Sequence, residues 1–279
     1  MKVLTACEYS GVVRDAFADR GCDAWSCDLL PSDRPAGQHY QGDVRDILDG
    51  GWDLIVAFPP CTYLCSSGMH WTTRGLRDPQ LTEDALNLVR LLLAAPCGKI
   101  AVENPIGCIS TRIRKPDQIL HPWQFGHNAS KTTCLWLKGL PLLTQTAIIG
   151  PGGGWKIVKF VADMVEDPDN PEEAFCLDCK MDFAECGCIG PTQDGIEYVT
   201  YGGVLFGRPE STASRKLLWG NQTPSGQNKL GPSPTRWKER SKTYEGIAHA
   251  MAEQWCPSSP PRIVPFPHVA GVRRSWHGS

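Results

Sequence analysis

The chain has 279 residues, 41% of them apolar, and a net charge of −2, which suits one large globular domain or a catalytic domain with a smaller lobe. It has no run of about 18 apolar residues, and its N-terminus turns polar too early for a signal peptide, so we expect a cytoplasmic protein without a membrane partner. The 13 cysteines are an odd number scattered through core-like segments, which argues against a disulfide framework and favours reduced thiols, metal ligands or a nucleophile.

The first half of the chain alternates short apolar runs with helical patterns. The periodicity predicts helices over Gly11–Arg20, with Ser10 as N-cap, and over Thr82–Ala95, with Thr82 as N-cap. Strands are expected over residues 2–6, 22–27, 52–57, 99–102 and 133–137. Strands that alternate with helices predict an α/β fold with a mostly parallel sheet and helices on both faces.

The pattern weakens near Gly150 and returns as a helical stripe over 243–255, before a proline-rich tail. We therefore expect a catalytic domain of residues 1–145 and 241–256, a separate region of 146–240, and an extended or disordered tail of 257–279. Within the middle region, 163–197 carries 11 acidic residues and one lysine, whereas 208–242 carries eight basic and two acidic residues. The second stretch is either a phosphate-binding surface or an ordinary solvated face.

Ligands of open α/β sheets bind at the carboxyl ends of the strands, and two such ends carry suggestive residues. The first predicted strand runs through Cys7, Glu8 and Ser10 into Gly11, where a ligand can approach the backbone closely. Asp28 ends the second strand and either binds ribose hydroxyls or is a plain turn residue. Asp43 either accepts a hydrogen bond from an adenine amino group or caps a helix.

Two further strand ends carry groups suited to covalent chemistry. Cys61 follows an apolar strand and two prolines, so a rigid loop holds its thiol at the same edge; the alternative is a buried apolar cysteine. Glu103 stands at the tip of another apolar strand, where a carboxylate is costly without a partner. Glu103 is therefore a candidate acid or hydrogen-bonding group facing Cys61.

Taken together, the glycine turn, Asp28, Gly42-Asp43, Pro60-Cys61 and Glu103-Asn104 resemble the cytosine-5 DNA methyltransferase family over residues 2–140. The resemblance implies a Rossmann-like class I fold that binds S-adenosylmethionine (SAM), with a small, irregular, cysteine-containing recognition lobe. It also implies that Cys61 attacks carbon 6 of a flipped cytosine while Glu103 contacts ring nitrogen 3, so that carbon 5 accepts the methyl group. The cofactor-binding set that it implies is Cys7, Glu8, Ser10, Gly11, Asp28, Asp43, Pro59 and Tyr244.

The sequence departs from the family pattern at several points. The first motif, Glu8 to Gly11, lacks the usual aromatic and glycine pair, and Pro105 replaces the usual valine. The Gln-x-Arg-x-Arg segment is missing, and Lys131 stands in its place, either as the missing catalytic cation or as a surface lysine. The closing motif, which returns to the SAM site, is assigned to 242–247 and the helix after it.

The middle region contains two candidate sites. Four cysteines with the spacing C-x2-C-x6-C-x-C suit a tetrahedral structural zinc, although free thiols in a loop are the alternative: Cys176, Cys179, Cys186 and Cys188. The basic stretch also holds amides and tryptophans that suit contacts with DNA phosphates and base edges, unless it is merely a polar loop. The DNA-contacting candidates are Arg215, Lys216, Gln222, Gln227, Asn228, Lys229 and Arg236.

These features predict a monomeric enzyme that methylates carbon 5 of cytosine in DNA. Three other functions stay open. The first is an amino-group methyltransferase, although the segment from Phe58 to Cys61 lacks the polar first residue and the aromatic fourth residue of that class. The second is transfer of another one-carbon unit to the same carbon. The third is a catalytically silent DNA-binding module with a zinc site.

Overall fold

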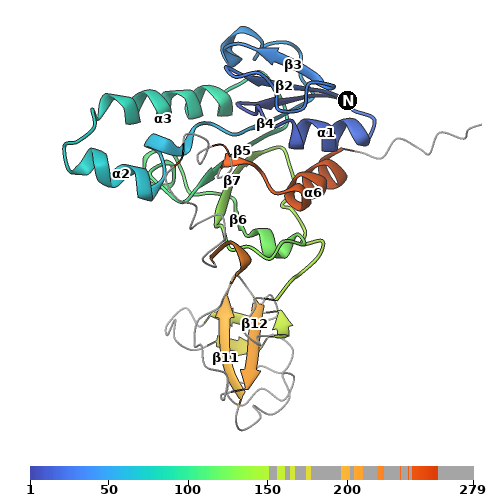
Figure 1. The fold of residues 1–279 in the computed structure, drawn as a ribbon, viewed down its shortest axis with the longest axis vertical. Helices are drawn as coiled ribbons and strands as arrows, with labels where there is room; N and C mark the ends of the chain where they lie inside the picture. Colours follow the sequence, from blue (N-terminus) through green and yellow to red (C-terminus); the bar gives the residue numbers. More distant parts are fainter. Residues whose placement is uncertain are drawn as a thin grey trace, which may run out of the picture.

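The computed structural model describes residues 1–150, 156–160, 164–166, 174–176, 196–201, 204–209, 219–222, 233, 238 and 241–256. Its centre is a seven-stranded sheet of order β3-β2-β1-β4-β5-β7-β6 (Figure 1). The strands are β1 (Lys2–Ala6), β2 (Asp23–Asp28), β3 (Gln38–Gln41), β4 (Leu54–Ala57), β5 (Ile100–Pro105), β6 (Gln118–Leu120) and β7 (Thr133–Lys138). The first five pair in parallel, and β7 is antiparallel to both of its neighbours.

Helices cover both faces of this sheet. Helices α1 (Val12–Asp19) and α6 (Glu245–Trp255) lie together on one face, and α3 (Gln80–Leu93) lies on the other (Figure 1). Helices α2 (Ser66–Thr73) and α4 (Ile109–Arg112) follow β4 and β5. The strand order and the two helix layers confirm the predicted Rossmann-like class I methyltransferase fold.

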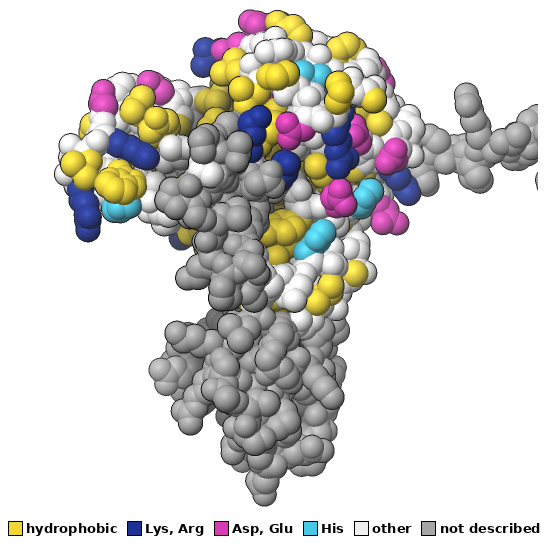
Figure 2. Space-filling view, in the orientation of Figure 1, with side chains coloured by type: hydrophobic (Ala, Val, Ile, Leu, Met, Phe, Trp, Pro, Cys, Tyr) yellow, Lys and Arg dark blue, Asp and Glu magenta, His cyan; other side chains and the backbone are white. Residues whose placement is uncertain are grey.

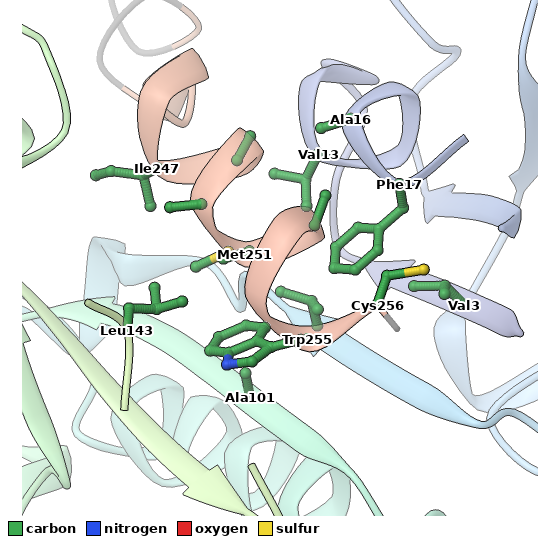
Figure 3. Packing of buried hydrophobic residues seen from close by; sticks show 14 of the residues in the cluster. Val3, Val13, Ala16, Phe17, Ala101, Leu143, Ile247, Met251, Trp255 and Cys256 are labelled. Atoms are coloured by element: carbon green, nitrogen blue, oxygen red, sulfur yellow. The ribbon is translucent and has the colours of Figure 1, made fainter. Parts of the chain in front are cut away.

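Each face of the sheet has its own hydrophobic core, because successive strand residues point to opposite sides. Val3 contributes to the core under α1 and α6, where Phe17, Met251 and Trp255 are buried (Figure 3). Leu4 contributes to the core under α3. The two cores fix the register of β1, since a shift of one residue would exchange its two faces.

Both predicted helix N-caps differ from the structure. Helix α3 begins at Gln80, two residues before Thr82, and Thr82 is buried inside the helix. At the helix start, Asp78 Oδ1 accepts a hydrogen bond from Gln80 N at 2.9 Å. The N-cap of α1 is Gly11, whose φ of 73° is the left-handed conformation that glycine adopts at little cost. Ser10 still contributes, because its Oγ and Glu8 Oε1 both accept from Val12 N.

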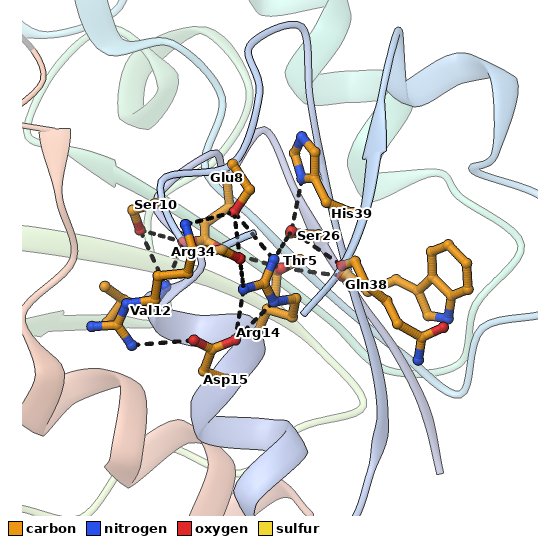
Figure 4. A network of polar contacts seen from close by, with 12 residues as sticks. Thr5, Glu8, Ser10, Val12, Arg14, Asp15, Ser26, Arg34, Gln38 and His39 are labelled. Atoms are coloured by element: carbon orange, nitrogen blue, oxygen red, sulfur yellow. Dashed lines mark hydrogen bonds and ion pairs between the residues drawn. The ribbon is translucent and has the colours of Figure 1, made fainter. Parts of the chain in front are cut away.

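A buried polar network holds the turn between β1 and α1 in place (Figure 4). The Arg14 side chain, only 1% exposed, donates to Asp15, Ser26 and Ser32 and to the carbonyl of Arg34. These bonds fasten the loop after β2 against α1. They satisfy a charged group that would otherwise be costly to bury, so the turn is a rigid platform.

The middle region contains strands that the sequence analysis did not predict. Strands β8 (Lys156–Phe160), β11 (Ile196–Tyr201) and β12 (Val204–Pro209) form an antiparallel sheet of order β11-β12-β8, and β9 (Met164–Glu166) pairs with β10 (Ala174–Cys176). In Figure 1, β11 and β12 lie below the seven-stranded sheet, beyond β6. The chain then returns to the main sheet as α6.

Among the described residues, a disulfide between Cys22 and Cys256 joins the residue before β2 to the residue after α6, and the sequence analysis did not predict it. Seven other described cysteines are free, as expected: Cys7, Cys27, Cys61, Cys65, Cys97, Cys108 and Cys134. Within the described ranges, none of the helices is both long enough and apolar enough to cross a bilayer.

Candidate active site

The predicted catalytic and cofactor residues lie at one edge of the sheet. Cys7 follows β1, Asp28 ends β2, Pro59 follows β4 and Glu103 lies in the last half of β5. These four strands are parallel neighbours, so their carboxyl ends meet at the same edge. The structure thus brings together residues that are as much as 96 positions apart in the chain.

Cys61 is partly exposed and begins the short 3-10 helix η2 (Cys61–Tyr63) directly after Pro60. Interaction with the Cys65 thiol, burial and the charge of Glu103 when it is ionised raise the pKa of Cys61, whereas Lys131 opposes the shift. The interactions with Glu103 and Lys131 place the three predicted catalytic residues within electrostatic range of one another, and they are called the Cys61 cluster below.

Glu103 is the acidic member of this cluster. Burial raises its pKa, while the positive charge of Lys131 and a hydrogen bond with Thr133 oppose the rise. A raised pKa lets the carboxyl group keep its proton at a higher pH than an exposed glutamate does. Glu103 can therefore donate a hydrogen bond to a ring nitrogen, and Lys131 supplies a cation beside it.

The sequence analysis missed Cys65, which is the N-cap of α2. Its sulfur lies 3.2 Å from Ser67 Oγ, and its backbone carbonyl accepts a hydrogen bond from Gly68 N at 2.9 Å. Interaction with Cys61 first, and then with Ser67 and the backbone at the start of α2, lowers the pKa of Cys65 to about 5 despite partial burial. The signal available in the sequence was the four-residue spacing of the two cysteines around the start of a helix.

Asn104 ties the ends of β4 and β5 together. Its side chain is buried, and its Nδ2 donates to the Pro59 carbonyl at 2.8 Å. Three residues after Asn104, Gly107 forms an isolated antiparallel β-bridge with Cys65. A Cβ atom on Gly107 would lie 1.9 Å from the Leu64 carbonyl oxygen. The loop that carries Cys61 and Cys65 is therefore fixed against the loop that follows Glu103.

We expect Asn104→Ala to lower both stability and turnover. The Pro59 carbonyl would lose its buried donor, which costs about 1–3 kcal/mol, and the Cys61 loop would lose an anchor. Urea denaturation would measure the first effect and single-turnover kinetics the second, with the exposed Asn87→Ala as control. Wild-type values for both quantities in Asn104→Ala would show that this hydrogen bond does not position the loop.

The predicted cofactor residues Cys7, Asp28 and Asp43 form a second group at the edge, close enough for both carboxylates to raise the pKa of the Cys7 thiol, after burial as the main cause. Cys7 has a φ of 58°, an unusual left-handed conformation for a residue with a side chain. Asp28 Oδ1 accepts from Leu30 N, and burial raises the pKa of Asp28. Asp43 caps the 3-10 helix η1 (Val44–Asp46) by accepting from Arg45 N, so the capping role is the one that the structure shows.

The Glu8 carboxylate points into the protein rather than toward the edge. It is only 4% exposed and bonds to Thr5, Ser10 and Val12 N (Figure 4). Burial raises the pKa of Glu8, and these bonds oppose the rise. The Glu8 side chain therefore supports the β1–α1 turn.

A cavity of ≈ 480 Å³ lies between this turn and the start of α6. It is lined by Ser10, Val12, Asp33, Arg34, His127, Lys242, Thr243, Tyr244 and Glu245, which include two predicted cofactor residues, Ser10 and Tyr244. Two hydrogen bonds hold the segment before α6 beside the β1–α1 turn. Tyr9 Oη donates to the Lys238 carbonyl and shares a hydrogen bond with Ser241 Oγ. The predicted closing motif therefore lies beside the β1–α1 turn.

Charges around this cavity are paired rather than of one sign. Arg34 contacts Glu245 at 3.1 Å, and Lys242 lies 3.6 Å from Asp33. Figure 2 shows acidic and basic side chains interspersed over the described surface of one face. The His127 Nε2 accepts a hydrogen bond from Gly246 N at 2.8 Å, which fixes the start of α6.

Most residues predicted to contact DNA or zinc lie outside the described residues: Arg215, Lys216, Gln227, Asn228, Lys229, Arg236, Cys179, Cys186 and Cys188. Cys176 ends β10, and Gln222 is exposed at the end of the 3-10 helix η6 (Gly220–Gln222). In the part of the chain that is described, no group of three His, Cys, Asp or Glu side chains could hold a metal ion. The zinc site stays a prediction.

The segment that contains Gln222 is anchored next to Lys131. Asn221 exchanges two hydrogen bonds with the backbone of Ser130, both of 3.0 Å, and Gly220 N donates to Asn128 Oδ1. Trp219 stacks on Trp123, with the ring centroids 5.5 Å apart. One part of the predicted DNA-contacting stretch thus lies beside Lys131 of the Cys61 cluster.

No protein-family model matches the chain, and no curated protein matches its sequence. Among solved structures, one similar chain is a prophage-encoded E. coli protein described as a DNA modification methyltransferase, with 16% identity, a TM-score of 0.36, and coverage of 53% of this chain and 52% of that chain. Another is the Entamoeba histolytica methyltransferase EhMeth, with 14% identity, a TM-score of 0.38, and coverage of 54% and 58%. This chain spans only about half the length of either structure, and its fold class follows from its own strand order and pairing.

Proposed function

We propose that the chain is a SAM-dependent DNA methyltransferase that modifies carbon 5 of cytosine through a covalent bond to Cys61. The observation that carries the proposal is the cluster of Cys61, Glu103 and Lys131 at the carboxyl edge of a Rossmann-like sheet. A thiol, a carboxyl group with a raised pKa, and a cation are the groups that nucleophilic attack on a pyrimidine ring requires.

Cys61, Glu103 and Lys131 each have a separate role in the proposed reaction. Cys61 adds through its sulfur to carbon 6, and the ring π electrons shift toward carbon 5. Protonated Glu103 donates a hydrogen bond to ring nitrogen 3, and Lys131 stabilises the negative charge that develops on the ring. Once carbon 5 has used this electron pair to bond the transferred methyl group, loss of its proton to solvent re-forms the double bond and expels the Cys61 thiolate. The target base must leave the DNA stack, because its ring atoms are shielded inside the duplex.

The described residues suit SAM at the neighbouring strand ends. Asp28, at the end of β2, can accept hydrogen bonds from ribose hydroxyls, and Asp43 lies close to it. The cavity beside Ser10 and Tyr244 offers paired charges for an amino-acid group, next to the N-terminus of α1. SAM supplies the reaction with a methyl group activated on a positively charged sulfur.

Mass spectrometry of nucleosides from DNA incubated with the protein and SAM would test the proposed product. We expect 5-methylcytosine, and none after incubation with Cys61→Ala. N4-methylcytosine or N6-methyladenine would instead indicate the amino-group class. A different one-carbon adduct at carbon 5 would leave the cysteine chemistry in place and exclude methyl transfer, and an unmodified substrate would favour a silent DNA-binding protein.

A further inference from the structure

His127 lies where the cavity beside α6 meets the segment that leads to Lys131. Its side chain lines the cavity together with Tyr244, and the two ring centroids are 5.1 Å apart. Its Nε2 accepts a hydrogen bond of 2.8 Å from the backbone N–H of Gly246, the second residue of α6. Lys131 of the Cys61 cluster follows four residues later in the chain. One side chain therefore contacts the wall of the cavity and belongs to the segment that carries the proposed catalytic cation.

The donor in this hydrogen bond fixes the state of the His127 ring. A backbone N–H can only donate, so Nε2 is unprotonated and the ring is neutral, with its proton on Nδ1. The amide of Gly246 is one of the first four of its helix, which have no partner within the helix itself. The imidazole therefore satisfies a donor that the helix leaves open.

The bond depends on a close approach of two backbone segments. A Cβ atom on Gly246 would lie 1.8 Å from the Phe125 carbonyl oxygen and 2.9 Å from His127 Nε2. Glycine allows the first turn of α6 to pack directly against residues 125–127. The position of this turn is thus tied to the position of the segment that begins at His127.

Few contacts set the position of residues 127–132, because they belong to no helix or strand. At the far end of this segment, Asn221 exchanges two hydrogen bonds with the backbone of Ser130. At the near end, His127 N donates to the Pro122 carbonyl, and the side-chain bond with Gly246 joins the segment to α6. Loss of the side-chain bond would release this end from α6 while the far end stays held.

On the basis of the proposed function, we infer that His127 is a positioning residue whose hydrogen bond with Gly246 holds the cofactor cavity and Lys131 in a fixed relation. The bond keeps the first turn of α6 against the cavity that Tyr244 lines. It also keeps the start of the segment in the place from which Lys131 reaches the Cys61 cluster. His127 itself exchanges no proton with the base and acts only through these neighbours.

Two substitutions separate the hydrogen bond from the bulk of the ring. His127→Phe keeps an aromatic ring against Tyr244 and removes the acceptor. His127→Gln removes the ring, but its amide oxygen can reach the place of Nε2 and accept from Gly246 N. The matched control is His249→Phe, which changes an exposed histidine of the same helix.

The first test measures SAM affinity by calorimetry and the single-turnover rate of methyl transfer at saturating SAM. We expect His127→Phe to lose at least about fivefold in each quantity, because a helix amide is left without its partner. His127→Gln should stay within about threefold of the wild type, and His249→Phe should match it. If circular dichroism shows that His127→Phe is unfolded, His127→Asn replaces it, since its amide is too short to reach Gly246.

Two results of this test would overturn the inference. One is a wild-type value of either quantity in His127→Phe, because a role confined to the cavity changes the affinity alone. The other is an equal loss in His127→Phe and His127→Gln, which would show that the ring fills space and that its acceptor is not what matters.

The second test is the pH dependence of SAM binding. Burial lowers the pKa of His127 from its usual value of 6.5, and the negative charge of Glu245 opposes the shift. The neutral acceptor is present above the folded pKa and is lost as pH falls through it, so the SAM affinity of the wild type should fall on the acid side of pH 6.5. His127→Gln cannot titrate and should lack this loss. The other charged or titratable groups that line the cavity are common to both proteins: Asp33, Arg34, Lys242 and Tyr244.

Equal pH profiles of SAM affinity in the wild type and His127→Gln would contradict the inference. This test needs no DNA and no turnover. It therefore decides on the His127 hydrogen bond even if the protein forms no methylated base, whereas the analysis of nucleosides decides on the proposed function.

Discussion

Replacing Cys61 with alanine is expected to reduce methyl transfer by at least about 10⁴-fold, because removal of a covalent nucleophile typically costs that much. The affinity for SAM should change little, since most of the predicted cofactor residues lie outside the Cys61 loop, five of them at the ends of β1 and β2. Single-turnover transfer of labelled methyl groups would measure the rate, and calorimetry would measure SAM binding. The control is Cys108→Ala, which removes another partly exposed thiol near the loop.

An active Cys61→Ala enzyme would contradict the proposed mechanism. Transfer within tenfold of the wild type would remove Cys61 as the nucleophile and would direct attention to Cys65. Loss of both transfer and SAM affinity would indicate instead that the Cys61 loop supports the cofactor site.

The second large effect is expected for Glu103→Gln. Glutamine can donate a hydrogen bond to ring nitrogen 3, but its amide is far less acidic than a carboxyl group and stabilises the charge developing on the ring less, so we expect the rate to fall by about 10²–10³-fold. In the wild type, burial raises the pKa of Glu103, and the proposed mechanism uses its protonated form. The rate contribution of Glu103 is therefore present below its folded pKa and is lost as pH rises through it. This alkaline limb should be absent in Glu103→Gln.

Stability provides an independent check on Glu103. A carboxyl group with a raised folded pKa stabilises the fold below its unfolded pKa, near 4.5, and loses this contribution as pH rises through the folded pKa. The free energy of unfolding of Glu103→Gln, relative to the wild type, should therefore increase between pH 4 and pH 8. The exposed Glu253→Gln serves as control. A pH-independent difference would show that burial does not raise the pKa of Glu103.

The elements best predicted from sequence are those whose apolar residues show which face is buried. Strand β1 was predicted with its observed bounds, and β4, β5, β7 and α6 within a few residues, because continuous apolar runs or a helical stripe mark them. Strands β3 and β6 were not predicted, because β3 is the polar sequence Gln-His-Tyr-Gln and β6 has only three residues. Their pairing depends on neighbouring strands that are distant in sequence.

The positions of the candidate site residues were predictable where those residues lie at strand ends. Cys61 and Glu103 each follow an apolar run, and Lys131 was placed by the order of the resemblance. The direction of a side chain is harder to predict. Glu8 turns inward because Thr5, Ser10 and Val12 N satisfy its carboxylate, and Cys65 acquires its character from a helix cap and a neighbouring thiol. Such contacts depend on three-dimensional packing rather than on spacing alone.

The most direct test uses DNA in which cytosine is replaced by 5-fluorocytosine at target sites. Fluorine cannot leave carbon 5 as a proton does, so sulfur that has bonded to carbon 6 stays attached after methyl transfer. We expect a SAM-dependent complex that survives denaturation, with the DNA linked to the peptide containing Cys61, and no complex with Cys61→Ala. An enzyme that methylates ordinary DNA yet forms no adduct, or an adduct on another residue, would contradict the account.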